Sequence, residues 1–335
     1  MTLLRRDAGI LLRGARSLVL LAGLLHSGPV SLAAEDRVRA GGNGKGSPTF
    51  RFEAVNDRSL KLWQGEHPVL VYNHGVITSQ AAPSAKGRSS YFHPVYGIEG
   101  EVLTDDFPKD HDYHRGLYWA WPHVKIGDRE VDLWTLRDVR HEFQRWLARK
   151  ANATGAELGV ENGWYVGTRR VMLERVWARI HPVSSQGRLI DLDLTLTPEG
   201  APVTLWGAEG KSYGGLTMRF APRTKTIITV SAGRSSDDLL MARLSWADFS
   251  GDLRNNGALS GAAIFVNPSH PSYPPTWMTR HYGLLAVGWP GVSPQSFPAG
   301  RPLSLSYRIW IHRGIPEAAV IQQAYDAYRE KKRSN

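Results

Sequence analysis

From Thr49 onward the chain is built of short segments in which apolar and polar residues alternate, separated by turn residues. Because successive side chains of a strand point to opposite faces, this alternation predicts β-strands with one buried face. The clearest case is "RLIDLDLTLTP" at 188–198, where Leu and Ile alternate with Asp and Thr. "HVKIGDREVDLW" at 123–134 predicts a hairpin that turns at Gly127 and Asp128.

A helix is predicted at the C-terminal end, over residues 316–332. Pro316 suits a first helical turn, Glu317 favours the positive end of the helix dipole, and the segment ends in basic residues. The residues that we expect on the docking face lie near helical spacing: Ala319, Val320, Gln323, Ala324 and Tyr328. Since helices do not alternate with strands, we expect an all-β fold, a large antiparallel β-sandwich with a C-terminal α-helix.

The N-terminus is typical of an export signal. Four arginines precede the apolar run "SLVLLAGLL", which is too short to span a bilayer, and small residues then favour cleavage after Ala33. We therefore expect a signal peptide at 1–33, a Gly-rich linker at 34–48 and a single domain over 49–335. This predicts a periplasmic or extracellular protein; the alternative is an uncleaved membrane anchor.

Composition excludes several classes of site and partner. The chain has no cysteine, so disulfides, thiolate nucleophiles and Cys-ligated zinc are ruled out. Its net charge of +10 falls to +7 when the four arginines and one aspartate of residues 1–33 are removed. Apart from a basic C-terminal end the positive residues are scattered, so we do not expect a nucleic-acid partner. The mature chain also lacks the run of about twenty apolar residues that a membrane-spanning helix needs.

Ionisable and aromatic residues concentrate in "KDHDYHRGLYWAW" at 109–121. Aspartate and histidine serve proton transfer and also bind metals, so Asp110, His111 and His114 are candidate catalytic residues. We expect a loop that enters a strand, with Arg115 and Trp119 able to contact a substrate. Metal binding and a purely structural loop, in which the histidines bond backbone carbonyls, are the alternatives.

Two further stretches could complete a site. Glu209 stands among glycines in "WGAEGKSYGGLTMRF" at 206–220, where it could act as a general base; a turn with solvated charges is the equal alternative. The stretch at 264–283 contains four prolines, which stiffen a loop, and offers Asn267, Trp277, Arg280 and Tyr282. A Trp face beside Arg and Asn donors suits a sugar, although Trp277 could instead pin a crossover loop in the core.

Common cofactor and nucleophile motifs are missing from the sequence. We find no Gly-x-Ser-x-Gly elbow, zincin helix, Walker loop or dinucleotide fingerprint. The sequence therefore names no cofactor and no metal ligand set.

Several motifs together resemble the PmoA-like family of exported bacterial proteins, also labelled "methane oxygenase PmoA". They are "YFHPVYG", "DHDYHRGLYWAW", "VDLW", "GGLTMR" and "WADFSG…GAAIFVNPSHPSYPPTWMTRHYG", and the resemblance extends from about Leu60 to Gly314. The family loop is closer to Asp-His-Pro-His-His-Arg-Gly, so this chain keeps His111, His114 and Arg115 but has Asp112 and Tyr113 between the histidines. The strand pattern is also similar to the galactose mutarotase-like supersandwich, which implies a carbohydrate role.

These observations lead to three hypotheses. The first is an exported carbohydrate-active enzyme of epimerase, lyase or glycosidase type, and not a methane monooxygenase subunit. In it, His111 or His114 acts as general acid or base and Glu209 or Asp110 is the complementary group. The second is a non-catalytic glycan-binding protein of the envelope. The third is a metal-dependent enzyme using His93, His111 and His114 with an aspartate. The residues expected to contact the carbohydrate are His93, Arg115, Trp119, Asn267, Trp277, Arg280 and Tyr282.

Overall fold

The computed structural model describes residues 48–82 and 86–331. The expected signal peptide, and all but the last residue of the expected linker, lie outside the described residues. The described residues belong to one compact unit. None of their helices is long and apolar enough to cross a membrane.

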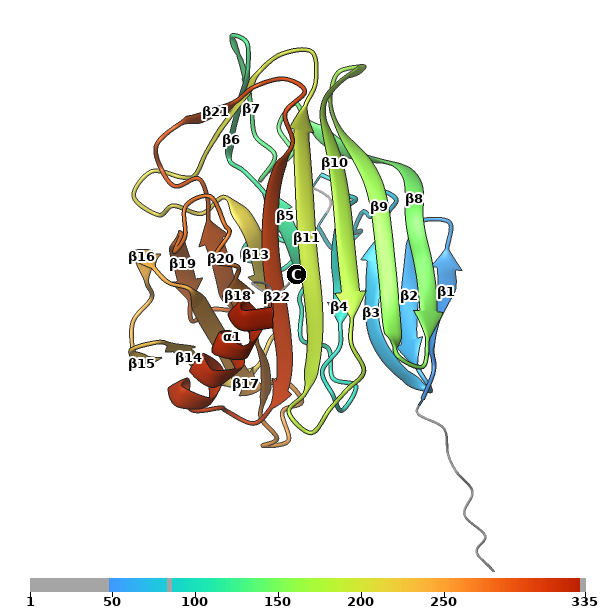
Figure 1. The fold of residues 1–335 in the computed structure, drawn as a ribbon, viewed down its shortest axis with the longest axis vertical. Helices are drawn as coiled ribbons and strands as arrows, with labels where there is room; N and C mark the ends of the chain where they lie inside the picture. Colours follow the sequence, from blue (N-terminus) through green and yellow to red (C-terminus); the bar gives the residue numbers. More distant parts are fainter. Residues whose placement is uncertain (1–47, 83–85, 332–335) are drawn as a thin grey trace, which may run out of the picture. The chain divides into compact units, whose positions relative to one another are not determined.

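Two large sheets dominate the described part of the chain (Figure 1). The first has nine strands, in the order β1 (Phe50–Asn56), β2 (Ser59–Gln64), β3 (His67–Asn73), β4 (Tyr91–Val95), β5 (Leu117–Ala120), β13 (Gly215–Arg219), β20 (Leu284–Gly288), β19 (Thr276–Arg280) and β16 (Leu240–Arg243). The second also has nine, in the order β15 (Gly233–Ser235), β14 (Thr224–Val230), β17 (Trp246–Asp252), β18 (Ser260–Val266), β22 (Leu303–Arg313), β11 (Arg188–Pro198), β10 (Arg169–Ile180), β9 (Gly155–Val166) and β8 (Arg140–Asn152).

A smaller sheet contains the predicted hairpin. Its order is β21 (Gln295–Phe297), β12 (Val203–Trp206), β6 (His123–Ile126) and β7 (Arg129–Val131). Gly127 has a φ of 60° at the first position of the β6–β7 turn, where two-residue hairpins favour glycine. Neighbouring strands in all three sheets pair antiparallel. The prediction of an all-β antiparallel sandwich is therefore confirmed.

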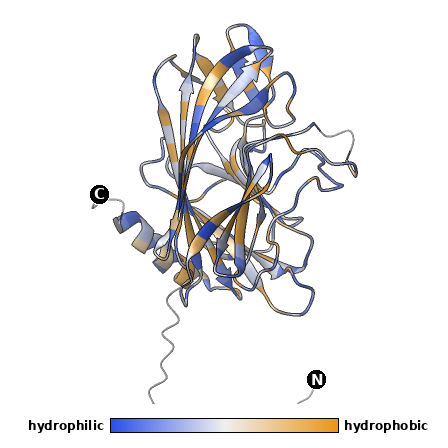
Figure 2. Ribbon diagram, turned by 90° about the vertical axis from the view of Figure 1, so that its right-hand side faces the viewer, coloured by the Kyte–Doolittle hydropathy of each residue, from blue (hydrophilic) through white to orange (hydrophobic). Residues whose placement is uncertain are grey.

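The core lies where the inner faces of the two large sheets meet. In β11 the predicted alternation is realised, since Leu192, Leu194 and Leu196 are fully buried while the residues between them are partly exposed. Figure 2 shows the corresponding alternation of hydrophobic and hydrophilic residues along the strands. One apolar cluster extends through both sheets, so burying these faces stabilises the sandwich as one body.

A buried carboxylate bridges the two sheets inside this core. Glu174 on β10 accepts hydrogen bonds from Trp119 Nε1 on β5 at 2.8 Å, Trp164 Nε1 at 2.7 Å and Asn162 Nδ2 at 3.0 Å. His141 Nε2 lies 3.5 Å from the same carboxylate. Burial alone raises the pKa of Glu174, but His141 and the hydrogen bonds outweigh it and lower that pKa below its ordinary value.

Helix α1 (Ala318–Lys331) covers the outer face of the second sheet (Figure 1). It begins two residues later than predicted, after Glu317, whose carbonyl accepts the first helical hydrogen bonds. Its buried face consists of Ile321, Tyr325 and Tyr328, which pack against aromatic residues of β17, β18 and β22. The predicted docking face was wrong at Ala319, Val320 and Gln323, which are exposed, because the larger side chains of Ile321, Tyr325 and Tyr328 form the buried stripe.

Candidate functional site

The three sequence stretches converge on one pocket of about 240 Å³. One wall comes from the loop that precedes β5, a second from the turn between β12 and β13, and a third from β19 and the residues that follow it. This convergence brings together His111, His114, Arg280 and Tyr282 from the predicted set. The residues that line the pocket are His111, Tyr113, His114, Trp134, Lys211, Tyr213, Asp238, Met278, Arg280 and Tyr282.

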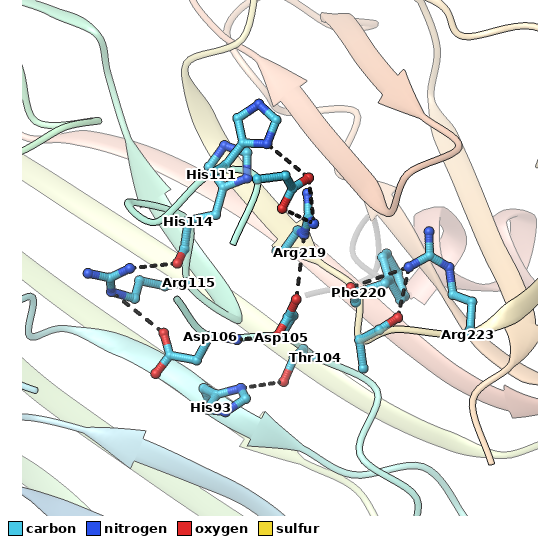
Figure 3. Close-up of polar contacts among 12 residues, drawn as sticks. His93, Thr104, Asp105, Asp106, His111, His114, Arg115, Arg219, Phe220 and Arg223 are labelled. Atoms are coloured by element: carbon cyan, nitrogen blue, oxygen red, sulfur yellow. Dashed lines mark hydrogen bonds and ion pairs between the residues drawn. The ribbon is translucent and has the colours of Figure 1, made fainter. Parts of the chain in front are cut away.

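Arg115 fixes the loop that carries the histidines. It is fully buried, and Nη1 donates to the carbonyls of Asp112 and His114 at 2.8 and 2.6 Å. Its Nη2 donates to the Lys86 carbonyl at 2.8 Å, and its guanidinium lies 3.5 Å from the centre of the Phe107 ring. Figure 3 shows it directed away from His111, towards Asp106. Arg115 therefore positions the loop and does not line the pocket, contrary to the substrate contact expected for it.

Asp110 is held between a cation and a histidine. Arg219 Nη2 donates to both carboxylate oxygens at 2.7 and 2.9 Å, and His111 Nδ1 lies 3.0 Å from Asp110 Oδ2. Burial would raise the pKa of Asp110, but the hydrogen bonds from Arg219 and then His111 lower it below its ordinary value. Arg219 and His111, both labelled in Figure 3, thus contact the same ionised carboxylate and form an Arg219–Asp110–His111 chain.

The His111 ring is part of an aromatic stack. Its centroid lies 4.6 Å from that of His114, with 4° between the planes, and 5.1 Å from that of Tyr282, with 18° between the planes. Arg219 lies 4.7 Å from the Tyr282 ring centre, so one guanidinium contacts both the carboxylate and the end of the stack. These contacts fix the plane of His111 at the pocket wall.

The two histidines have different environments. His114 is 2% exposed and packs edge-on to Trp134 at 5.5 Å, whereas the His111 side chain is 31% exposed. Burial, reinforced by His111 and Arg219, lowers the pKa of His114 to about 2. His114 is therefore a neutral imidazole at physiological pH, and its Nδ1 is buried with no hydrogen-bond partner among the described residues.

Two further cations, Arg280 and Lys211, line the pocket. Arg280 Nη1 lies 3.3 Å from Asp238 Oδ2, and the same carboxylate lies 2.8 Å from His281 Nδ1. Lys211 is exposed at the rim, beside Tyr213. The pocket thus combines aromatic faces with cationic groups at its edge.

The sequence matches a protein-family model over most of its length. That model is described as "Family of unknown function (DUF6807)" and matches residues 59–326. The chain belongs to the DUF6807 family. No curated protein matches its sequence.

Parts of larger solved structures are similar to this DUF6807 chain at very low sequence identity. Heparan sulfate lyase HepC from Pedobacter heparinus has a TM-score of 0.37 and 7% identity, over 80% of this chain and 36% of its own. The alpha-galactosidase from Lactobacillus brevis has a TM-score of 0.37 and 9% identity, over 79% of this chain and 39% of its own. GH36 alpha-galactosidase AgaA from Geobacillus stearothermophilus has a TM-score of 0.38 and 8% identity, over 80% of this chain and 41% of its own. The DUF6807 chain thus spans about two fifths of the length of these proteins.

Four other predicted residues lie away from the pocket. Trp119 and Trp277 are fully buried, with their indole nitrogens donating to Glu174 and to the Leu244 carbonyl. Neither therefore presents a ring face to a ligand in this structure, contrary to expectation. Asn267 Nδ2 donates to Tyr328 on α1 at 3.3 Å, and Glu209 is exposed in the turn between β12 and β13. Neither of these two side chains lines the pocket either.

His93 does not line the pocket either, and Figure 3 shows it apart from His111 and His114. Its Nδ1 lies 3.0 Å from Thr104 Oγ1, and burial, with Arg115 nearby, lowers its pKa to about 4. His93 therefore does not join His111 and His114 in one ligand set. Within residues 48–82 and 86–331, no group of three or more His, Asp or Glu side chains is placed to hold a metal ion.

Sequence reasoning missed several residues of the pocket. Tyr113 and Lys211 lie inside stretches already singled out, and Trp134 ends the "VDLW" motif. A rule that every aromatic residue near these motifs could line the site would have found Tyr113 and Trp134. Met278 also lies inside such a stretch but is not aromatic, and Asp238 lies outside all of them. They reach the pocket because β16 pairs with β19 at the edge of the first sheet.

Proposed function

We propose that this chain is an exported carbohydrate-active enzyme that abstracts a proton from an anionic sugar. The observation that carries the proposal is the Arg219–Asp110–His111 chain at the wall of an aromatic pocket with cations at its rim. A carboxylate that orients an imidazole is the arrangement by which proteins prepare a histidine for proton transfer.

The pocket lining supports a sugar as the substrate. Tyr113, Tyr213, Tyr282 and Trp134 each offer an apolar ring with a polar tip, which suits a ligand that has both C–H faces and hydroxyl groups. Lys211 adds a positive charge for which the described residues supply no ion-pair partner. A uronate, whose carboxylate could meet that charge, fits this combination better than a neutral sugar.

The proton chemistry follows from the geometry. His111 Nδ1 lies 3.0 Å from Asp110 Oδ2, which leaves Nε2 as the atom that exchanges a proton with the substrate. The C–H bond next to the sugar carboxylate breaks, the proton moves to His111 Nε2, and the electron pair develops on the carboxylate, where a rim cation stabilises it. If the bond from the neighbouring carbon to its oxygen substituent then breaks, the oxygen leaves with the electron pair of that bond and a C=C bond forms. Delivery of a proton to the opposite face of the carbon gives the epimer instead.

Hydrolysis by a pair of carboxylates is less well supported by the same lining. That reaction needs two carboxyl groups on either side of the scissile bond. Asp238 is the one carboxylate among the described lining residues, and it is engaged by Arg280 and His281. The proposal is therefore a lyase or epimerase reaction.

The test is a product screen with a matched pair of variants. The protein is incubated with uronate-containing glycans, and products are followed by alkene absorbance, mass spectrometry and proton NMR in deuterated water. We expect His111→Asn to reduce turnover by about 10²–10⁴-fold, the usual contribution of a general base. His123→Asn is the control, because His123 also lies 2.8 Å from a carboxylate, that of Glu130, but is outside the pocket.

Two outcomes would overturn the proposal. Turnover by His111→Asn within a few-fold of the unmodified protein would remove His111 from the chemistry. Saturable glycan binding that survives His111→Asn, with no product from any glycan, would instead favour the glycan-binding alternative.

A further inference from the structure

A second pocket, of about 320 Å³, shares no lining residue with the first. It lies where the ends of β2 and β22 meet the starts of β3 and β11 and the connection between β10 and β11. Its apolar side is formed by proline, isoleucine and valine, and its polar side by two arginines, a histidine, a glutamine and a glutamate. The lining residues are Pro48, Gln64, His67, Ile98, Glu99, Pro182, Val183, Arg188 and Arg313.

Arg188 is a buried cation in the wall of this pocket. It is 4% exposed, its Nη1 donates to Gln64 Oε1 at 2.9 Å, and its guanidinium lies 5.9 Å from the Phe50 ring centre. No described carboxylate lies within ion-pair distance of it. Burial lowers the pKa of Arg188 to about 10, so the group is still charged at neutral pH.

Another arginine on the same sheet has a carboxylate partner. Arg308 is similarly buried, but its Nε and Nη2 donate to both carboxylate oxygens of Asp191, at 2.6 and 2.9 Å. A charge removed from water is costly unless an opposite charge and hydrogen bonds compensate it. Arg188 is paired with the neutral amide of Gln64, whereas Arg308 is paired with a carboxylate. A counter-charge for Arg188 can be placed only on the side of its guanidinium that faces the pocket.

The rim of the pocket also favours an anion. Arg313 Nε donates to Glu99 Oε1 at 2.6 Å, so these two charges balance, and His67 is exposed beside them. Gln64 Oε1 accepts from Arg188 and from the Val183 backbone, which leaves its amide nitrogen to donate elsewhere. The pocket therefore has one uncompensated positive charge and additional donors around it.

We propose that this second pocket binds a small oxyanion, a carboxylate, sulfate or phosphate group, through the planar guanidinium of Arg188. Two parallel N–H donors match two oxygens of such a group, and this is the geometry in which arginine binds oxyanions most strongly. The anion supplies the counter-charge that Asp191 supplies to Arg308. The inference does not depend on the proton chemistry proposed for the first pocket.

Thermal unfolding of the full chain tests the proposal. Melting temperatures are compared in chloride buffer and, at equal ionic strength, in sulfate, phosphate and glucuronate. At about ten times the dissociation constant, the binding anion should raise the melting temperature by about 2–4 °C. Arg188→Met should lose this shift and should be at least as stable as the unmodified protein in chloride, since it removes a buried uncompensated charge.

Two control variants distinguish binding at Arg188 from binding elsewhere on the protein. Arg145→Met removes an exposed arginine on β8 that is paired with Glu161, and it should keep the shift. Lys211→Met, at the first pocket, should keep the shift in sulfate and in phosphate. A response to glucuronate that Arg188→Met abolishes, with no response to the inorganic anions, would identify a sugar acid as the ligand of the second pocket. A response to sulfate or phosphate would identify an inorganic oxyanion or its esters.

Equal shifts in the unmodified protein and in Arg188→Met would mean a general salt effect and would overturn the proposal. Calorimetric titration of the unmodified protein with each anion gives a second measurement in case Arg188→Met does not fold. Binding that is saturable there supports the site, and the absence of binding heat with all three anions, together with no melting shift, rejects it.

Discussion

The buried carboxylate of Glu174 allows a stability prediction with a magnitude taken from the structure. Glu174→Leu removes the acceptor and leaves three buried donors in place, the indoles of Trp119 and Trp164 and the amide of Asn162. A buried donor left without an acceptor costs about 1–3 kcal/mol, so the three together cost roughly 3–9 kcal/mol. Domains unfold with about 5–15 kcal/mol, so we expect this variant to be barely stable or unfolded.

Glu174→Gln separates the charge from the hydrogen bonds. The glutamine side chain has a similar shape and keeps one acceptor oxygen. Its hydrogen bonds are no longer made to a charged group, and its new N–H groups face the donors of Trp119, Trp164 and Asn162. The expected loss is about 3 kcal/mol, since bonds to charged groups are stronger than neutral ones by about 1 kcal/mol each. Urea unfolding followed by tryptophan fluorescence measures both variants.

Glu53→Leu is the control for removing a carboxylate. Glu53 is exposed on β1, so its substitution should change the free energy of unfolding by no more than about 0.5 kcal/mol. Combining Glu174→Leu with Trp119→Phe removes one stranded donor, so the pair should cost less than the sum of the single changes. A loss below about 1 kcal/mol for Glu174→Leu, or strict additivity in the pair, would refute the reasoning.

Two further predictions concern a buried ion pair and the first pocket. Burial raises the pKa of Asp191, but hydrogen bonds from His181 and Arg308 hold it well below its ordinary value. The ionised Asp191 therefore contributes its full stabilisation above the pKa of an unfolded aspartate, and this stabilisation is lost as pH falls towards the lower pKa of the native state. The urea midpoint of unfolding should drop between about pH 4 and pH 2, and it should drop less in Asp191→Asn. Glu209→Gln should leave turnover of a glycan substrate within about two-fold, because Glu209 does not line the pocket; a large loss in steady-state assays would return Glu209 to the reaction.

The fold could be predicted because its signals are local. A period of two in hydrophobicity, as in β11, requires no knowledge of which strand pairs with which. The helix was also predictable from its composition and its basic end. The buried face of the helix was not predictable, because Ala319 and Val320 are apolar as well as Ile321 and Tyr325. Which of these residues pack against the sheet depends on the shape of the sheet.

The site was only partly predictable, because strand alternation does not say which face is the core. His114 and Arg115 are neighbours in the sequence, yet one lines the pocket and the other is directed beneath the loop. Trp119 and Trp277 looked suited to stacking but lie on inward faces. The convergence itself depends on the order β5–β13–β20–β19, which pairs strands from distant parts of the chain and leaves no local mark in the sequence.

The two stacked histidines have different environments, and the contrast suits the reaction that we propose. His114, buried against Trp134, stays neutral and so gives His111 a flat, uncharged surface to stack on. In the proposed reaction the proton that reaches His111 places its charge beside the Asp110 carboxylate and against the Tyr282 ring face, both of which stabilise a cation. A second protonated histidine at 4.6 Å would oppose that charge, so the low pKa of His114 keeps this repulsion out of the proposed site.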